Sequence, residues 1–199
     1  MREYSRAPRI PLQERDDLVS LKQEIAQQRP FSSAAEEALL NLFRTADMMQ
    51  REMHLLIKPW GITSTQYNVL RILRGAHPEG LTCTAIGVRM ITADPDITRL
   101  LARLKTMKLV RQQRDKRDRR VVWNHISPEG LALLDQMDPE IAQFPEELLA
   151  GLSENDREEL IRLLELVRSS RGAGHVTCDG KPTCDGAPTC DGKPTCDGK

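Results

Sequence analysis

Apolar residues recur at helical spacing along most of the chain, and scattered Pro and Gly residues divide this pattern into segments. The widest apolar stripe predicts a helix over 33–58, where Ser33 and Glu36 form a capping-box pattern at the start. A weaker stripe predicts a preceding helix over 12–28. Because the 33–58 stripe is wide for a surface helix, part of it is expected to pack on a partner subunit.

Three shorter segments with helical spacing follow the long one. Helices are expected over 63–74 and 82–90, each opened by a threonine that can cap it. A third is expected over 94–108, with Asp94 as its cap and Pro95 at the first helical position. Two short helices, a tight turn and a basic helix occur in the order of a helix-turn-helix.

The pattern then changes to extended segments before it returns to helix. Stretches 109–114 and 120–126 contain β-forming residues on either side of a charged tip, which predicts a β-hairpin. Helix is expected to restart at Pro128 after the capping residue Ser127, and a last helix to open at Ser153. The expected fold class is mainly α with a small β-hairpin wing, a winged helix-turn-helix flanked by N- and C-terminal helices.

These segments divide the chain into five regions. They are a partly helical N-terminal extension (1–30), a long helix (31–60), the winged helix-turn-helix (61–127), C-terminal helices (128–170) and a tail of Cys-Asp-Gly repeats (171–199). The tail has almost no apolar residues that could be buried, so it is expected to be disordered.

Composition narrows the function classes. With 199 residues, 39% of them hydrophobic, the chain can bury a sizeable core. No apolar run is long enough to span a bilayer and no signal peptide is evident, so a soluble cytoplasmic protein is expected. A Gly-rich phosphate loop, a Ser/His/Asp arrangement and a His-Glu-x-x-His motif are all missing, so neither an enzyme nor a cofactor is expected.

The net charge of zero conceals a separation of charge along the chain. Segment 94–120 holds ten Lys/Arg against four Asp, a net charge of +6. Segment 129–167 holds two Arg against eleven Asp/Glu, a net charge of −9. The first segment suits the phosphates of nucleic acid, and the second is expected to face away from them.

The polar face of the helix predicted over 94–108 suits the major groove of DNA. Arginine can donate two hydrogen bonds to guanine, threonine offers a hydroxyl and a methyl group, and alanine permits close approach. A merely solvated charged face is the alternative for an isolated helix, and the adjoining turn and hairpin weigh against it. The candidate groove residues on this helix are Thr98, Arg99, Ala102, Arg103 and Thr106.

The charged tip of the predicted hairpin suits a narrow minor groove, whose negative potential attracts arginine. A solubilising edge is the alternative, and the excess of basic residues argues against it. The candidate residues at the tip are Arg117, Asp118, Arg119 and Arg120.

Several of these segments together resemble the MarR family of transcription regulators. The resemblance rests on Gly-Ile-Thr-Ser-Thr-Gln-Tyr-Asn-Val-Leu at 61–70, Ile-Thr-Arg-Leu at 97–100, Asp-Arg-Arg at 118–120 and Ile-Ser-Pro-Glu-Gly at 126–130. It covers about 33–167 and implies that Arg120 enters the minor groove with Asp118 as its brace. It also implies that regions 31–60 and 128–170 are dimerisation helices of a homodimer, which binds a pseudo-palindromic site in double-stranded DNA. Repression is the family's default.

Members of the family often release DNA when a small, commonly phenolic, ligand enters a cleft. The resemblance therefore implies a small aromatic ligand as a further partner, and packing of Trp60 and Tyr67 in the core is the alternative. The candidate pocket residues are Met53, His54, Trp60, Tyr67 and Arg71.

Cysteine usage leaves two other function classes open. Cys83 stands alone in the body of the chain and is expected to be a small buried thiol. The tail cysteines could bind Zn or Cu(I), but their six-residue spacing is unlike that of zinc sites, so no metal site is assigned. A metal- or thiol-responsive regulator and a winged-helix protein-interaction module stay open as alternatives. The tail candidates are Cys178, Cys184, Cys190 and Cys196.

Overall fold

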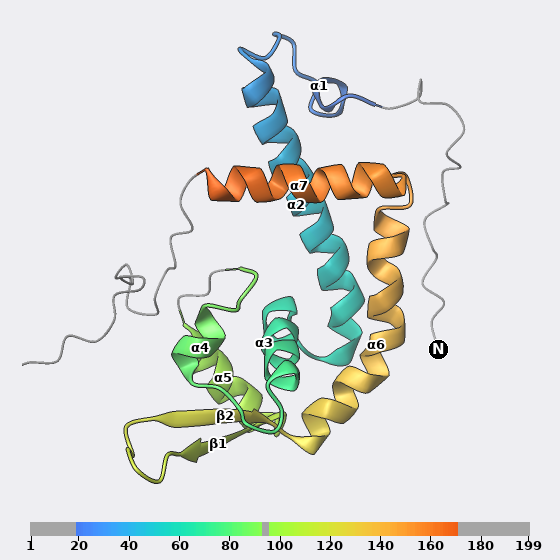
Figure 1. Cartoon of the computed structure of the whole chain (residues 1–199). Helices are drawn as coiled ribbons and strands as arrows, with labels where there is room; N and C mark the ends of the chain where they lie inside the picture. The colour runs from blue at the N-terminus through green and yellow to red at the C-terminus, as the bar shows by residue number, and fades with distance from the viewer. Residues whose placement is uncertain (1–18, 93–95, 171–199) are drawn as a thin grey trace, which may run out of the picture. The chain divides into compact units, whose positions relative to one another are not determined.

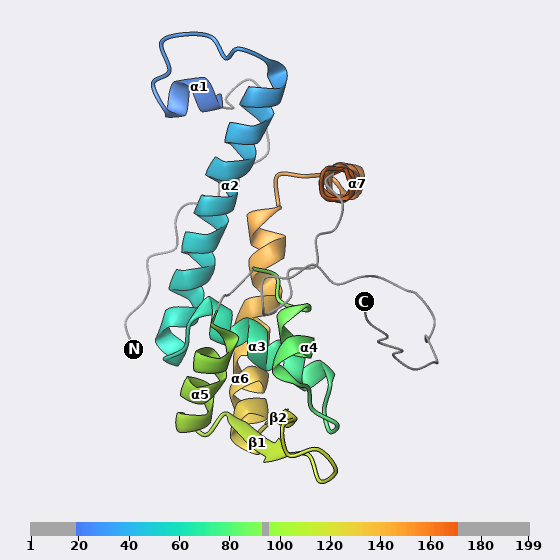
Figure 2. The same ribbon diagram turned by 90° about the vertical axis from the view of Figure 1, so that its left-hand side faces the viewer.

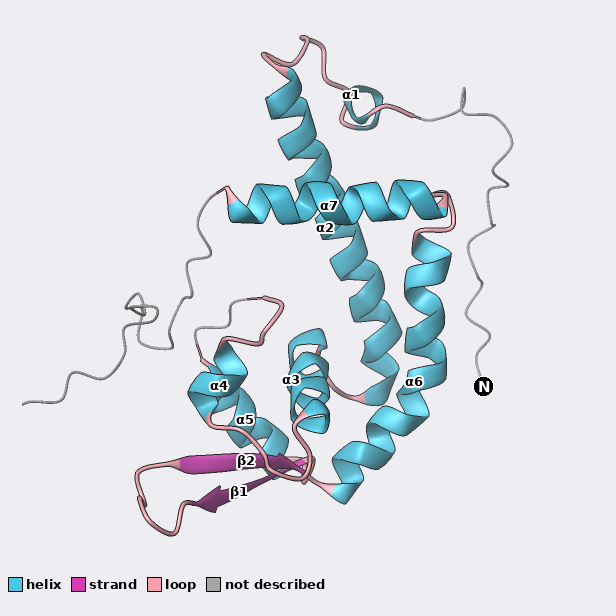
Figure 3. Cartoon of the chain, in the orientation of Figure 1, coloured by secondary structure: helices cyan, strands magenta, loops and turns pink. Residues whose placement is uncertain are grey.

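The computed structural model describes residues 19–92 and 96–170 (Figure 1). These residues divide into two compact units, one made of 19–62 and 138–161, the other of 63–137 and 162–170. Helices account for nearly all the regular structure, and the strands that the structure describes form one antiparallel hairpin (Figure 3). The predicted fold class, mainly α with a β-hairpin, is confirmed.

The long helix α2 (Ala34–Ile57) dominates the first unit and continues into the 3₁₀ turn η2 (Lys58–Trp60). Its predicted cap is present, since the Ser33 hydroxyl accepts from the backbone N–H of Glu36 at 3.1 Å. Only half of the predicted capping box forms. The Glu36 carboxylate accepts instead from the backbone N–H and hydroxyl of Ser32, and these bonds lower the pKa of Glu36.

The helix predicted over 12–28 is wrong in the part that the structure describes. α1 (Leu21–Glu24) is a single turn, capped by Ser20. It ends because Ala26 takes a left-handed backbone conformation, with φ of 52°. Residues 12–18 lie outside the described residues.

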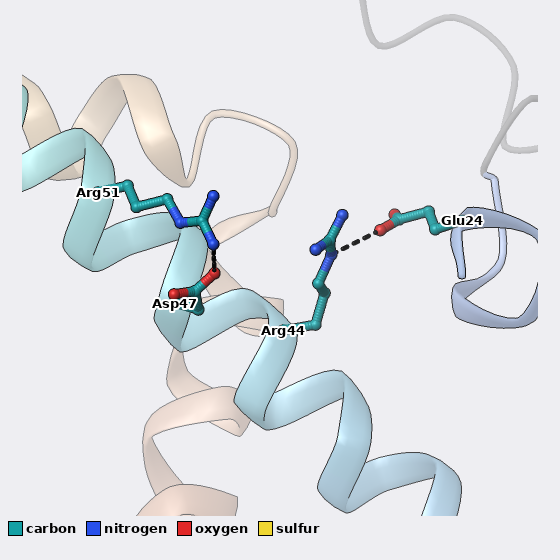
Figure 4. Close-up of polar contacts among 4 residues, drawn as sticks. All are labelled: Glu24, Arg44, Asp47 and Arg51. Carbon is teal, nitrogen blue, oxygen red and sulfur yellow. Dashed lines mark hydrogen bonds and ion pairs between the residues drawn. The ribbon is translucent and has the colours of Figure 1, made fainter.

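Two of the ion pairs in the first unit involve α2 (Figure 4). Glu24 of α1 lies 3.3 Å from Arg44 of α2, and Asp47 pairs with Arg51 one turn further along α2 at 2.7 Å. All four side chains are largely exposed, so each pair contributes little to stability.

The second unit contains three helices in the order of a helix-turn-helix: α3 (Ser64–Gly75), α4 (Cys83–Gly87) and α5 (Ile97–Thr106). The capping box at Thr63 and Gln66 forms in full. The Thr82 hydroxyl accepts from the backbone N–H of Ala85, but α4 ends three residues before the predicted Met90.

The start of α5 differs from the sequence-based expectation. Asp96, not Asp94, is the N-cap, and its carboxylate accepts from the backbone N–H of Arg99 at 3.0 Å. The turn preceding α5 is tied to α3, since the side-chain oxygen of Asn68 accepts from the backbone N–H of Ile91 at 3.1 Å. The predicted positions of Asp94 and Pro95 lie outside the described residues.

Strands β1 (Val110–Arg114) and β2 (Val122–Ile126) form the predicted hairpin, with Val110 opposite Ile126. An isolated bridge adds Leu81 to the outer side of β2, opposite Asn124. The two views agree that the hairpin loop projects beyond the three helices of its unit (Figures 1 and 2).

Helices α3, α4 and α5 pack on one another and on the hairpin, and apolar side chains fill the space between them. Burial of these side chains fixes α5 against the rest of the unit. The fully buried ones include Val69, Leu70, Leu73, Ile86, Leu101, Leu104 and Val110.

Helix α6 (Pro128–Leu148) begins at the predicted cap, where the Ser127 hydroxyl accepts from the backbone N–H of Gly130 at 2.9 Å. It continues through Pro139 and Pro145, which therefore do not break it. Helix α7 (Glu154–Ser169) follows and is capped as predicted by Ser153, whose hydroxyl accepts from the backbone N–H of Asp156.

Gly130 occupies a position with no room for a side chain. A Cβ atom there would lie 2.5 Å from the carbonyl oxygen of Leu109 and 2.8 Å from the Ile126 side chain. We expect Gly130→Ala to lower the free energy of unfolding by about 1–3 kcal/mol, measured by chemical denaturation. Gly75→Ala is the matched control, since nothing lies within 4 Å of its Cβ and alanine favours helix by up to about 1 kcal/mol. Equal stability of the two variants would contradict the packing at Gly130.

Candidate nucleic-acid interface

Helix α5 presents two different faces. Ile97, Leu100, Leu101 and Leu104 are buried against the rest of the unit. The opposite face is exposed and carries all five residues that the sequence assigned to the major groove, so α5 has the amphipathic form of a recognition helix. These exposed residues are Thr98, Arg99, Ala102, Arg103 and Thr106.

The two threonine hydroxyls of α5 already have neighbours within the protein. Thr106 donates to the carbonyl oxygen of Ala102 at 3.1 Å. The Thr98 hydroxyl lies 3.7 Å from the sulfur of Cys83 on α4. Cys83 is half-buried rather than fully buried as expected, and it links the two helices of the motif.

The arginines of α5 differ from the threonines. No hydrogen bond or ion pair to another described residue engages the guanidinium groups of Arg99 and Arg103. Each therefore keeps its five N–H donors for bases or phosphates.

The tip of the hairpin is organised by two aspartates. One Asp115 oxygen accepts from the backbone N–H groups of Arg117 and Asp118, at 2.7 and 3.0 Å. Its other oxygen accepts from the indole N–H of Trp123 at 3.0 Å. The backbone N–H of Asp118, with the indole and the N–H of Arg117, holds the pKa of Asp115 below its usual range.

Asp118 contacts the backbone of Arg120 rather than its side chain. Its carboxylate accepts from the Arg120 N–H at 2.9 Å. Among the described residues, no acid pairs with the Arg120 guanidinium, which is exposed like its basic neighbours at the tip. The exposed basic residues of this tip are Arg114, Lys116, Arg117, Arg119 and Arg120.

A shallow cleft of about 390 Å³ adjoins the tip. Its wall includes the Trp123 and His125 side chains of β2 and Glu79 from the loop after α3. His125 is held by the carbonyl oxygen of Pro78, 3.0 Å from its Nδ1 atom. The remaining lining residues are Gln113, Arg114, Asp115, Lys116 and Arg117.

The residues predicted to line an effector pocket fall in both units. Met53 and Trp60 are half-buried and His54 is exposed in the first unit. In the second, Tyr67 is buried and the exposed Arg71 guanidinium lies over its ring, 5.9 Å from the centroid. This distance is within the range of a cation–π contact.

The described residues contain neither a metal-binding cluster nor a membrane-spanning helix. Within 19–92 and 96–170, no three His, Cys, Asp or Glu side chains gather closely enough to hold a metal ion. No helix in these ranges has the length and apolar content needed to cross a bilayer. The four tail cysteines lie outside the described residues.

Neither Asp115 nor Trp123 was among the residues predicted from the sequence to bind DNA. A sequence signal for Asp115 was available, because an aspartate at the start of a turn often forms an Asx turn. In such a turn its carboxylate accepts from backbone N–H groups a few residues later, as Asp115 does from Arg117 and Asp118. The Trp123 contact depends on the strand register, which places Trp123 opposite Gln113 near the tip.

Comparison with known proteins agrees with this geometry. The MarR family model matches residues 60–121, which span the helix-turn-helix, β1 and the hairpin loop. The chain is 39% identical to a MarR transcription factor from Planctomyces limnophilus of known structure. That match has a TM-score of 0.54 and covers 69% of this chain and 99% of the other.

Two further relatives are similar. The HTH-type transcriptional regulator MhqR of Bacillus subtilis is 27% identical over 121 residues, 61% of this chain and 79% of MhqR. The PcaV transcriptional regulator from Streptomyces coelicolor, solved in complex with its natural ligand, is 27% identical, with a TM-score of 0.54 over 64% of this chain and 90% of PcaV. From its fold, its exposed basic helix and these matches, the chain belongs to the MarR family of DNA-binding transcription regulators.

Proposed function

We propose that this regulator is a homodimeric repressor that reads a pseudo-palindromic site in double-stranded DNA through α5 and the hairpin wing. The observation that carries the proposal is the exposed basic face of α5, in the same compact unit as an exposed basic hairpin tip. As a repressor it acts without catalysis, in the cytoplasm. Regions 31–60 and 128–170 serve dimerisation and 61–127 binds DNA.

The two basic surfaces take different parts in binding. Arg99 and Arg103 are one helical turn apart on the exposed face of α5, so both can reach base edges when α5 lies in the major groove. Arg120 at the wing tip matches a minor groove, whose narrow walls concentrate negative potential. Contacts at the tip position the protein, and contacts from α5 specify the sequence.

Acidic residues oppose contact of the C-terminal region with DNA. Segment 129–167, which contains most of α6 and α7, has a net charge of −9. This negative segment repels phosphates, whereas the segment 94–120 with its net charge of +6 attracts them. The charge distribution therefore selects the surface that approaches DNA.

Dimerisation is supported by large apolar side chains that stay exposed in the single chain. Helix α2 exposes Leu39, Leu42 and Phe43, which are spaced three and four residues apart and share a face. Helix α7 exposes an apolar series as well, and contiguous exposed apolar surface marks protein interaction sites. The exposed apolar residues of α7 are Ile161, Leu163, Leu166 and Val167.

A small aromatic effector is supported by the Arg71 and Tyr67 pair and by the family. The exposed Arg71 guanidinium over the Tyr67 ring offers a cation beside an aromatic face, which suits an aromatic carboxylate or phenolate. PcaV was solved with its natural ligand, so a ligand-bound form exists in a relative.

The assignment of roles on α5 and the wing predicts two different losses. Arg99→Ala should relax the preference at one base position by about 1–3 kcal/mol, because a bidentate contact to guanine is lost. Arg120→Ala should weaken binding to all sequences and reduce the salt dependence, since a groove cation is removed. Binding titrations on a panel of single-base operator variants at several salt concentrations measure both effects. Arg29→Ala, an exposed arginine outside α5 and the wing, is the control. Unchanged binding by Arg120→Ala would overturn the role of the wing.

The dimer proposal predicts that a charge on the exposed apolar face of α7 disrupts assembly. Leu166 is 56% exposed in the single chain, so Leu166→Glu should leave the monomer folded and shift the mass in sedimentation from dimer to monomer. Gln28→Glu places the same charge at an exposed position outside both dimerisation regions and should leave the dimer intact. A dimer of undiminished stability in Leu166→Glu would exclude this face.

The effector proposal predicts that Arg71 governs ligand release but not DNA binding. A panel of phenols and hydroxybenzoates should include compounds that lower the fraction of bound DNA in the wild type. Arg71→Ala should require about tenfold more of an active hydroxybenzoate, because its carboxylate loses a charged partner. Affinity for DNA without ligand should match the wild type. Equal sensitivity of the two proteins would rule out Arg71 as a ligand contact.

A further inference from the structure

The basic residues at the tip of the wing repel one another, which disfavours a single ordered conformation of this loop. Five exposed basic residues lie within 114–120, where their mutual repulsion favours an open, variable loop. Ordering such a loop on DNA costs conformational entropy at each binding event. A tip that is already ordered before binding avoids this cost.

A network of hydrogen bonds around Asp115 orders this tip. Asp115 stands at the end of β1, and its backbone N–H donates to the carbonyl of Val121 at 2.9 Å. Its carboxylate closes the loop from inside by accepting from the backbone N–H groups of Arg117 and Asp118. Val121 in turn donates to the carbonyl of Asp118 at 3.0 Å, so the loop carries hydrogen bonds from both aspartates.

The indole of Trp123 ties this loop to the sheet. Trp123 lies in β2, pairs in register with Gln113, and is half-buried. Its N–H reaches the second oxygen of Asp115 at 3.0 Å. The carboxylate thus joins three N–H donors, two from the loop and one from the strand, and each is a charge-assisted bond.

We propose that Asp115 and Trp123 are positioning residues that hold the wing tip in its DNA-binding conformation before DNA arrives. The inference rests on the proposed function, since it assigns to the wing the contact with a minor groove. Asp115 contributes through geometry although its charge is unfavourable near phosphate. Bonds from three N–H groups keep the carboxylate ionised, in line with its lowered pKa.

Because Asp115 is negatively charged, a positioning role and a purely electrostatic effect predict opposite changes in DNA affinity when it is removed. If Asp115 acted only as a negative charge among arginines, its removal would raise affinity for DNA or leave it unchanged. A positioning role predicts the opposite, a loss of affinity on removal of an acid. Glu79 supplies the control, because it lines the same cleft and has no hydrogen bond or ion pair to another described residue.

The test measures DNA affinity for five variants of this chain. Asp115→Ala removes all three bonds and should weaken binding by about tenfold or more. Asp115→Asn keeps one oxygen for the loop but cannot accept from the indole, and Trp123→Phe keeps a ring without its N–H. Each should weaken binding by about threefold to tenfold, and the double variant should be no weaker than either single one, because both remove the same bond. Glu79→Gln should bind as well as the wild type or better.

A spectroscopic signature independent of DNA accompanies the affinities. The chain has two tryptophans, so its ¹⁵N-labelled form gives two indole N–H signals in NMR spectra. Asp115→Ala should move the Trp123 signal upfield and leave that of Trp60 in place. If the wild-type protein fails to bind DNA, the proposed function is wrong, and the indole signal still reports the hydrogen bond between Trp123 and Asp115. If it binds and Asp115→Ala binds equally or more tightly, the positioning role is overturned. Additive losses in the double variant would overturn the pairing of Asp115 with Trp123.

Discussion

The DNA-binding unit depends on one buried amide. Asn124 of β2 is 1% exposed, and its backbone exchanges two hydrogen bonds with Leu81, at 2.8 and 2.9 Å. Its side chain donates to the Leu81 carbonyl at 3.0 Å and accepts from Gln112 of β1, also at 3.0 Å. A single residue therefore joins both strands of the wing to the segment that leads into α4. Leaving a buried amide without such partners would cost about 1–3 kcal/mol, so its position is strongly determined.

The bonds of Asn124 help to fix the positions of α4, α5 and the wing, which carry the candidate interface. The segment at Leu81 leads directly into the cap of α4, and α4 packs on both α5 and β2. At the other end of the hairpin, the Ser127 hydroxyl donates to the carbonyl of Lys108 at 2.7 Å and caps α6. Gly130 has no side chain, which lets α6 approach the backbone of Leu109. The exposed arginines of α5 and the wing are thus carried by elements that buried contacts hold in place, as a preformed DNA-binding surface requires.

Features set by local pattern were predictable from the sequence. The caps at Thr63, Ser127 and Ser153 each follow from a hydroxyl residue ahead of a helical stripe, and all three are present. The apolar positions of α5 likewise fixed which side of that helix is buried. The boundaries of the hairpin strands agree with the β-forming residues to within one or two positions.

Features that depend on a choice between two possible caps, or on residues distant in the sequence, could not be predicted from the sequence. Either Asp94 or Asp96 could cap α5 by residue type, and the proline after Asp94 favoured the wrong one. The stripe over 12–28 gave no warning of the left-handed residue Ala26, which stops α1 after one turn. The bonds of Asn124 to Leu81 span 43 positions along the chain, and a single bridge residue has no strand pattern to predict it.

Helix α5 and the wing, on this interpretation, form one surface that binds a specific DNA sequence. A decisive experiment titrates the protein with the DNA upstream of its own gene and with a scrambled duplex, over a range of salt concentrations. We expect tighter binding to the upstream DNA and an affinity that falls steeply as salt rises, because several phosphate contacts release counterions. Equal affinity for both duplexes, or affinity independent of salt, would contradict it.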